Sequence, residues 1–247
     1  MNKLAVLAFS LLIFFSTMLW YLANGSLNEY LKSQVELQGH YYSGQTTSVK
    51  LANYATNAGI ATFQQLSLNN FENTQTPHAL EIDEAQVKVS MPQSRHLLTI
   101  IDNITINKLT LNVVQNKGEK TNITQLIQQI TLQLANDYPE FYPTISAKLY
   151  AKKNPELNAQ SYAKSHPQAG PIIEHTTPKK KRGKPQQKIA ILTINIKTLE
   201  LNTTQNDVTT STKKYDVNIS SIGNKEGLVI NQLGGELLLH LLNLAKQ

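Results

Sequence analysis

The 247-residue sequence contains no cysteine. This absence excludes disulfide bonds, thiol catalysis, cysteine-based zinc sites and cysteine-ligated iron–sulfur clusters. The sequence therefore permits an oxidising compartment without indicating one.

The sequence also lacks the spacings that catalytic and metal sites require. Its histidines are scattered, with no HExxH motif and no pair four residues apart. They are His40, His78, His96, His166, His175 and His240. No glycine-rich phosphate loop occurs, since GNKEG and LGGE lack both the spacing and the strand-to-helix context. We therefore expect no enzyme activity, no cofactor and no metal.

One acidic cluster, Glu81, Asp83 and Glu84, lies among the predicted strands. Hydrolysis by two carboxylates needs groups held across a cleft rather than along one strand. We interpret the cluster as the solvated face of a strand, with a bulge near Asp83 and Glu84.

The longest apolar run extends from Leu4 to Ala23, LAVLAFSLLIFFSTMLWYLA, and contains no charge. At ~1.5 Å per residue such a helix spans ~30 Å, which is the thickness of the hydrocarbon core. The run predicts a transmembrane anchor over residues 4–23. Its expected membrane residues include Leu4, Phe14, Phe15, Trp20 and Tyr21, the last two at the interface. The alternative is a cleavable signal peptide, cut before Ser26.

The charges that flank this run predict its orientation. Lys3 and the terminal amine precede it, whereas Glu29, Lys32 and Glu36 follow it and sum to one negative charge. The positive-inside rule then keeps residues 1–3 in the cytoplasm and exports the remainder. We expect a single-pass membrane protein with its C-terminal body outside the cytoplasm.

The net charge of +6 comes from one segment. Between Lys148 and Lys188 ten basic residues stand against two acidic ones, whereas the rest of the chain carries a net charge of minus two. The span over residues 137–187 also holds seven prolines and little apolar periodicity. We therefore expect a basic linker, most of it disordered.

The basic run of this linker, KKKRGK, leaves three interpretations open: a solvated flexible tether, an anionic-lipid patch or a nucleic-acid arm. The lipid interpretation uses Lys179, Lys180, Lys181, Arg182 and Lys184. No aromatic residues interleave with the lysines as a base-stacking surface requires, and export separates the chain from nucleic acid. We expect no nucleic-acid partner.

Alternating apolar residues predict a series of β-strands on both sides of the linker. The clearest, ITINKLTLN at residues 104–112, recurs almost unchanged in KIAILTINIKTLELN at residues 188–202. The second copy has one extra residue before Thr198. Two copies of one strand unit therefore flank the linker.

Three helices are expected beside these strands. One covers residues 26–38 and ends at Gly39, and a second is capped by Thr121 or Asn122. The third spans Asn231–Lys246 and carries a broad stripe of leucines, so it must pack against another element.

The patterns together predict an α+β, β-rich protein in five parts. These are a cytoplasmic tip (1–3), the anchor (4–23), a first helix and β-rich half (24–136), the linker (137–187) and a second β unit with the C-terminal helix (188–247).

This order of elements resembles the AsmA-like proteins of the Gram-negative envelope, in particular their short single-unit members. The resemblance rests on the anchor, the helix and turn LNEYLKSQVELQGHYYSG, the strands ALEIDEAQVKVS and ITINKLTLNVVQN, the helix TNITQLIQQI, and DVNISSIGNKEGLVINQL before the last helix. The Asn-Pro that the family usually shows after its early strand is Asn70-Phe71 here.

The resemblance implies a curved antiparallel sheet with an apolar groove, anchored in the inner membrane with its body in the periplasm. It also implies a role in envelope lipid transport or homeostasis. An apolar groove can retain an acyl chain, because each methylene buried in it contributes ~0.8 kcal/mol to the binding free energy. The alternative is a non-enzymatic accessory or structural subunit of an envelope assembly. The expected partners are therefore the membrane, phospholipid, and an envelope protein or a second copy.

Overall fold

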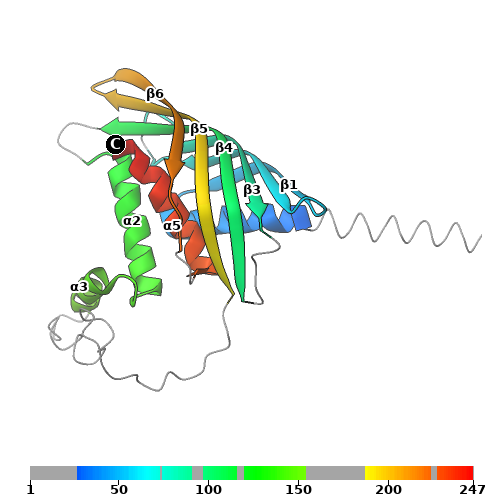
Figure 1. The fold of residues 1–247 in the computed structure, drawn as a ribbon. Coiled ribbons are helices and arrows are strands. Elements are labelled where there is room, and N and C mark those ends of the chain that lie inside the picture. The colour runs from blue at the N-terminus through cyan, green and yellow to red at the C-terminus, as the bar shows by residue number, and fades with distance from the viewer. Residues whose placement is uncertain are drawn as a thin grey trace, which may run out of the picture.

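The computed structural model describes residues 27–72, 74–90, 97–115, 120–153, 187–223 and 227–246. In this part of the chain the strands form one curved, unclosed sheet (Figure 1). They are β1 (Thr47–Ala55), β2 (Ile60–Asn69), β3 (His78–Val89), β4 (Leu98–Gln115), β5 (Lys188–Gln205), β6 (Val208–Ile219) and β7 (Leu228–Val229). Their spatial order is β1-β2-β3-β4-β5-β6, with β7 paired to the start of β5. The predicted α+β, β-rich class is confirmed.

The sheet is mixed rather than antiparallel throughout. β1 to β4 form an antiparallel series and β6 is antiparallel to β5, but β4 and β5 run parallel. The expectation of a fully antiparallel sheet is wrong at this pair. Its cause is the connection: between β4 and β5 the chain passes through the helices Asn122–Asp137 and Pro143–Lys153, and a long crossover of this kind can return the next strand in the same direction.

The parallel pair consists of the two copies of the repeated strand unit. Ile104 pairs with Ile194 and Leu111 pairs with Leu201, and the register is constant along both strands. The structure therefore aligns the two copies without an insertion, and the expectation of one extra residue before Thr198 is wrong. Matching side chains of the two copies stand next to each other on the same face.

All six long strands share one irregular level, which we call the crease. There the pairing of neighbouring strands skips one or two residues and resumes in the same register. The crease residues include Lys50, Gln65, Asp83, Glu84, Asn107, Lys197 and Asp216. In β3 the buried positions jump from Ile82 to Ala85, so the strand is irregular at the place where a bulge was predicted near Asp83 and Glu84. The irregularity is not a one-residue bulge, because the register does not shift.

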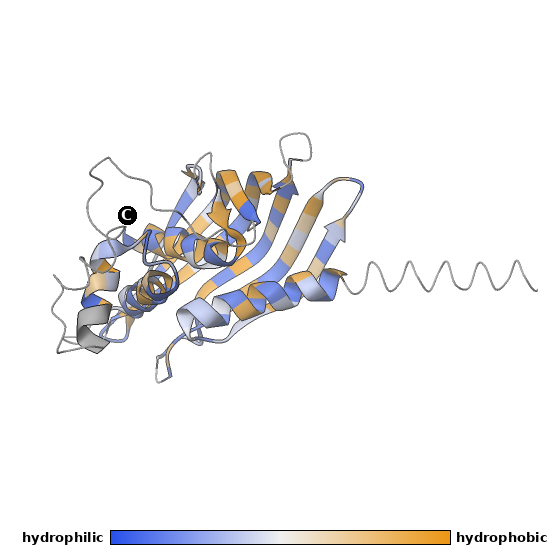
Figure 2. Ribbon diagram, turned by 90° about the horizontal axis from the view of Figure 1, so that it is seen from below, coloured by the Kyte–Doolittle hydropathy of each residue, from blue (hydrophilic) through white to orange (hydrophobic). Residues whose placement is uncertain are grey.

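Helices cover the concave side of the sheet (Figures 1 and 2). They are a helix over residues 27–43, α2 (Asn122–Asp137) and α5 (Ile230–Asn243), which the 3-10 helix η2 (Leu244–Lys246) continues. A further helix, α3 (Pro143–Lys153), packs on α2. Thr121 caps α2 by accepting a hydrogen bond from the N–H of Thr124 at 3.1 Å, as predicted for one of the two candidates.

The first helix is longer than predicted. It continues past Gly39 to residue 43 and ends before Gly44, whose φ of +66° suits a glycine at a helix end. Gly39 serves close packing instead, because a Cβ there would lie 2.3 Å from Oγ1 of Thr47. The expectation that Gly39 ends the helix is wrong for this reason.

The C-terminal helix packs into the core, close to its predicted bounds. Its buried leucines are Leu241, Leu242 and Leu244, and those partly buried against the core include Leu233, Leu237 and Leu238. α5 contacts α2 and β5. The leucine stripe predicted from the sequence thus packs against other elements of the same chain.

Two predicted segments lie outside the described residues: the anchor over residues 4–23 and the linker beyond Lys153. Among the helices that the structure describes, none has the length and apolar character needed to cross a membrane. The linker was expected to begin at residue 137 and to be mostly disordered, but α3 (Pro143–Lys153) forms within its first part. Ser146 Oγ of α3 donates a hydrogen bond to the carbonyl of Ala135 at 2.6 Å and so fixes α3 to the end of α2.

Candidate interaction surfaces

The predicted site residues lie outside the part of the chain that the structure describes. They are the anchor residues Leu4, Phe14, Phe15, Trp20 and Tyr21 and the basic residues Lys179, Lys180, Lys181, Arg182 and Lys184. Of the surfaces that the structure does describe, the acidic cluster of β3 was considered from the sequence, and the others were not.

The inner face of the sheet is apolar, and helices pack against it. Leu109 and Leu111 of β4 are fully buried. α2 contributes Leu126, Ile130 and Leu134 to the same core, since a spacing of four residues places them on one side of the helix. The protein's own side chains therefore occupy the described part of the face where acyl chains would lie in an open groove.

Close packing holds α5 on this face. A Cβ on Gly235 would lie 2.9 Å from both Leu134 Cδ2 and Tyr42 Cδ1, so the three helices approach each other only because this residue is glycine. Tyr42 also donates a hydrogen bond from Oη to the carbonyl of Asn231 at 2.7 Å. α5 is therefore fixed from two sides, by α2 and by the helix over residues 27–43.

Buried polar groups add a second contact to α5. The hydroxyl of Tyr142 donates to the Glu236 carboxylate, and Gln232 Nε2 donates to the same group at 3.3 Å. Burial raises the pKa of Tyr142 and of Tyr42, so both phenols stay protonated and act as donors near neutral pH. The cluster positions the helices.

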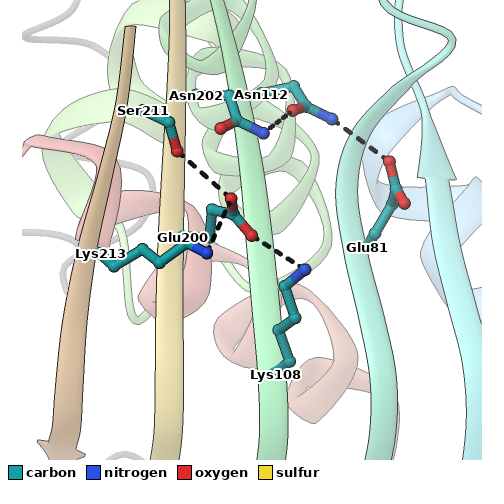
Figure 3. Close-up of polar contacts among 7 residues, drawn as sticks. All are labelled: Glu81, Lys108, Asn112, Glu200, Asn202, Ser211 and Lys213. Atoms are coloured by element: carbon teal, nitrogen blue, oxygen red, sulfur yellow. Dashed lines mark hydrogen bonds and ion pairs between the residues drawn. The ribbon is translucent and has the colours of Figure 1, made fainter.

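The outer face of the sheet is polar and carries a network across three strands (Figure 3). Glu200 of β5 forms ion pairs with Lys108 of β4 at 2.9 Å and with Lys213 of β6 at 3.7 Å. The hydrogen bond from Lys108 holds the pKa of the Glu200 carboxyl below its usual range. Beside this network Asn202 donates to Asn112 Oδ1 at 3.0 Å, so the repeated asparagines of β4 and β5 bond across the parallel pair.

The acidic cluster of β3 bonds to amides on the same face. Glu84 accepts hydrogen bonds from Asn107 at 2.9 Å and from Gln86 at 3.0 Å, and Asp83 is exposed. Glu81 accepts one from Asn112 at 3.3 Å. This is the arrangement expected of a solvated strand face. Within the described residues, no group of three or more His, Cys, Asp or Glu side chains is placed to hold a metal.

A shallow cleft of about 590 Å³ lies along α2. It is lined by Phe71, Gln125, Gln128, Gln129, Leu132, Gln133, Asn136 and Leu149. Amides dominate this lining, and they donate and accept hydrogen bonds without a charge or a nucleophile. The cleft therefore offers hydrogen-bond donors and acceptors to a ligand.

The two edges of the sheet differ. The helix over residues 27–43 protects the β1 edge, where Glu36 Oε1 and Asn28 Oδ1 each accept a backbone N–H at 2.9 Å, from Val49 and Tyr54 respectively. β6 ends the sheet on the other side and, among the described strands, pairs only with β5. An unpaired edge presents N–H and C=O groups to which another strand can bond. The run VTTSTKKY, with no alternation of apolar residues, is the sequence signal that marks this strand as solvated.

Comparisons of the chain with protein-family models, with curated proteins and with solved structures find no match. The AsmA-like resemblance rests on the sequence segments alone.

Proposed function

We propose that this protein is a non-enzymatic accessory subunit of a Gram-negative envelope assembly, anchored in the inner membrane by one helix, and that its periplasmic body binds a protein partner. The uncharged run over residues 4–23 and its flanking charges support the membrane location. The AsmA-like segments support the envelope setting.

The packed inner face is the observation that carries the proposal. Leu109 on the sheet and Leu242 on α5 are both fully buried and belong to one hydrophobic core. A sheet that stores acyl chains needs this apolar surface to be open, whereas here it stabilises the fold. Recognition is then left to the polar outer face, the amide-lined cleft and the bare strand edge, which suit a protein ligand.

Lipid transport through an apolar groove is the second candidate. Its support is the composition of α5, where partly buried leucines such as Leu233, Leu237 and Leu238 add to the buried ones. Displacement of this helix would uncover the apolar core side chains beneath it, against which an acyl chain could pack. Lipid transport therefore requires α5 to leave the sheet, whereas binding of a protein partner does not.

Mass spectrometry of the full-length protein, extracted in mild detergent, tests the proposed function. We expect a protein partner at fixed stoichiometry. Phospholipid at fixed stoichiometry, with no protein partner, would contradict the proposal and favour the groove.

The basic run over residues 179–184 is tested separately. Sedimentation with anionic vesicles compares the full chain with a variant that lacks this run. Unchanged binding indicates a flexible tether, whereas a loss of binding indicates a patch in which each basic residue contributes ~1 kcal/mol.

A further inference from the structure

Three large apolar side chains form one exposed stripe on the helix over residues 27–43. The exposed fractions of Tyr30, Leu37 and Tyr41 are 59%, 61% and 55%. Their spacing of seven and four residues places them on the same side of an α-helix. Another side of the helix packs on the fold, where Leu31 and Val35 contact the apolar residues of β1 and β2. The stripe therefore faces away from this core.

A polar strip runs beside the apolar stripe on the same helix. Its residues, Glu29, Ser33 and His40, are exposed and again share one side, at spacings of four and seven residues. The exposed surface of the helix is thus divided lengthwise into an apolar part and a polar part. This division is typical of a helix that lies at a boundary between membrane and water.

The position of the stripe in the chain indicates what covers it. The uncharged run predicted as the anchor ends at Ala23, and the helix begins by Leu27. A chain of this length spans at most about 14 Å, so the start of the helix stays close to the membrane surface. Between them lies Asn24-Gly25, a pair that favours turns and permits the helix to take a direction different from that of the anchor.

The charges around the stripe do not attract an anionic surface. The helix carries Glu29 and Glu36 against Lys32, a net charge of minus one. At the end of α2 the Asp137 carboxylate interacts with the hydroxyl of Tyr41. Apolar burial, rather than attraction to anionic lipid headgroups, is therefore the interaction that this surface offers to a membrane.

We propose that the helix over residues 27–43 lies along the membrane surface, with Tyr30, Leu37 and Tyr41 at the boundary between headgroups and acyl chains. Tyrosine is enriched at this depth, because its ring is apolar and its hydroxyl reaches water. This inference rests on the anchor of the proposed function and deepens it: the β1 edge lies next to the membrane, and β6 ends the sheet on the other side. A membrane is favoured over a second copy as the occupant, because the anchor holds it beside the stripe of every molecule.

Fluorescence quenching tests this arrangement with the full-length protein in phosphatidylcholine vesicles that carry bromine near the headgroup end of the acyl chains. Trp20 is the single tryptophan, so its quenching in the wild type reports on the anchor. In a Trp20→Phe background, Tyr30→Trp and Tyr41→Trp probe the two ends of the stripe. Val208→Trp, at a residue of β6 that is 64% exposed, is the control in the same background. We expect bromination to lower the emission of both stripe probes at least about twofold and to leave the control unchanged, because interfacial helices bury their apolar side about 5–10 Å deep.

Two glutamate substitutions separate apolar contact from proximity to the membrane. Leu37→Glu places a charge in the middle of the stripe, whereas Ser33→Glu places the same charge on the polar strip. Both residues are exposed, so neither change enters the core. In the Tyr41→Trp protein we expect Leu37→Glu to reduce the quenching at least about twofold and Ser33→Glu to leave it unaltered.

Four results would overturn the proposal. Quenching of Tyr30→Trp without quenching of Tyr41→Trp would describe a helix that stands upright on the membrane, since the two positions would then differ in depth by ~16 Å. Equal quenching in the two glutamate variants would remove the role of the stripe. Unquenched stripe probes whose emission shifts to shorter wavelength as the protein concentration rises would assign the stripe to a second copy. Unquenched stripe probes beside a quenched Trp20 would leave the anchor standing, whereas an unquenched Trp20 would contradict the anchor of the proposed function however the stripe probes respond.

Discussion

The two edge strands of the sheet differ in how their outward-facing backbone N–H and C=O groups are covered. At β1 a helix packs along the strand and its side chains accept edge N–H groups, whereas β6 pairs only with β5 among the described strands and none of its residues is buried. The faces differ in the same way, since helices pack on the inner face (Figure 2), whereas the outer face carries the ion pairs of Glu200 with Lys108 and Lys213. The molecule therefore has a closed side, formed by the inner face and β1, and an open side, formed by the outer face and β6. The closed side stabilises the fold, and the open side is free to bind.

The largest expected effect comes from a charge placed inside the closed side. Leu126→Asp, at a fully buried position of α2, should destabilise the protein by about 3–5 kcal/mol, because the carboxylate has no partner there. Gln128→Asp, exposed on the same helix, should change stability by less than ~0.5 kcal/mol. Thermal unfolding of both variants measures the difference. Similar losses would show that α2 is not closed over the sheet.

A smaller effect is expected at the buried amide that joins the sheet to α2. Asn122 Oδ1 accepts the Val114 N–H at 2.8 Å, and its Nδ2 donates to Asn70 Oδ1 at 3.0 Å and to the Asn112 carbonyl at 2.7 Å. Asn122→Ala leaves these groups unpaired and should cost about 2–3 kcal/mol.

The control for this amide is Asn103→Ala, which removes a side chain that is only partly buried. Its cost in urea unfolding should stay below about 1 kcal/mol. Equal losses for the two asparagines would mean that the buried amide network adds nothing beyond a surface bond.

The closed edge can be opened by one substitution. Glu36→Ala removes the acceptor of the Val49 N–H and should cost about 1 kcal/mol, with faster hydrogen exchange at that amide. Glu29→Ala, exposed on the same helix, is the matched control and should leave this exchange rate unaltered. If the Val49 amide is equally protected in both variants, Glu36 does not protect the edge.

The smallest effect belongs to the ion pairs of the open side. Because Lys108 holds the pKa of Glu200 below its ordinary value, the carboxylate contributes stability above the unfolded pKa and loses it as pH falls through the folded pKa. The contribution should stay below about 1 kcal/mol, since Lys108 is partly solvated. The stability difference between wild type and Glu200→Gln should narrow below about pH 4. A difference that is constant with pH would place the effect outside this titration.

Local patterns predicted the parts of the fold that depend on local physics. The start of α2 at Thr121 or Asn122 and the leucine stripe of the last helix follow from neighbouring residues, and the structure confirms them. The irregularity near Asp83 and Glu84 was also predicted at its place, although as a bulge. The strand repeat was also visible, but its parallel pairing was not, because register and direction depend on the crossover between β4 and β5.

The candidate surfaces depended on long-range contacts and could not be read from the sequence. In the sequence Glu36 was considered only as a charge that flanks the anchor. It accepts the Val49 N–H only because the fold places β1 beside the helix over residues 27–43. β6 becomes an edge only through the order of all the strands. The predicted anchor and basic-run residues lie outside the described residues, so they stay predictions.

A disulfide that locks α5 in place tests the central claim most directly. The chain has no cysteine, and a Cβ on Gly234 would lie 3.0 Å from the Cβ of Gln38, so a slight relaxation allows a bridge between Gln38→Cys and Gly234→Cys. The measurement is mass spectrometry of the full-length double variant, extracted in mild detergent under oxidising and reducing conditions. The account predicts the same protein partner at the same stoichiometry in both forms, because binding uses the open side. Phospholipid that binds only the reduced form would contradict it, since α5 would then have to leave the sheet for the protein to act.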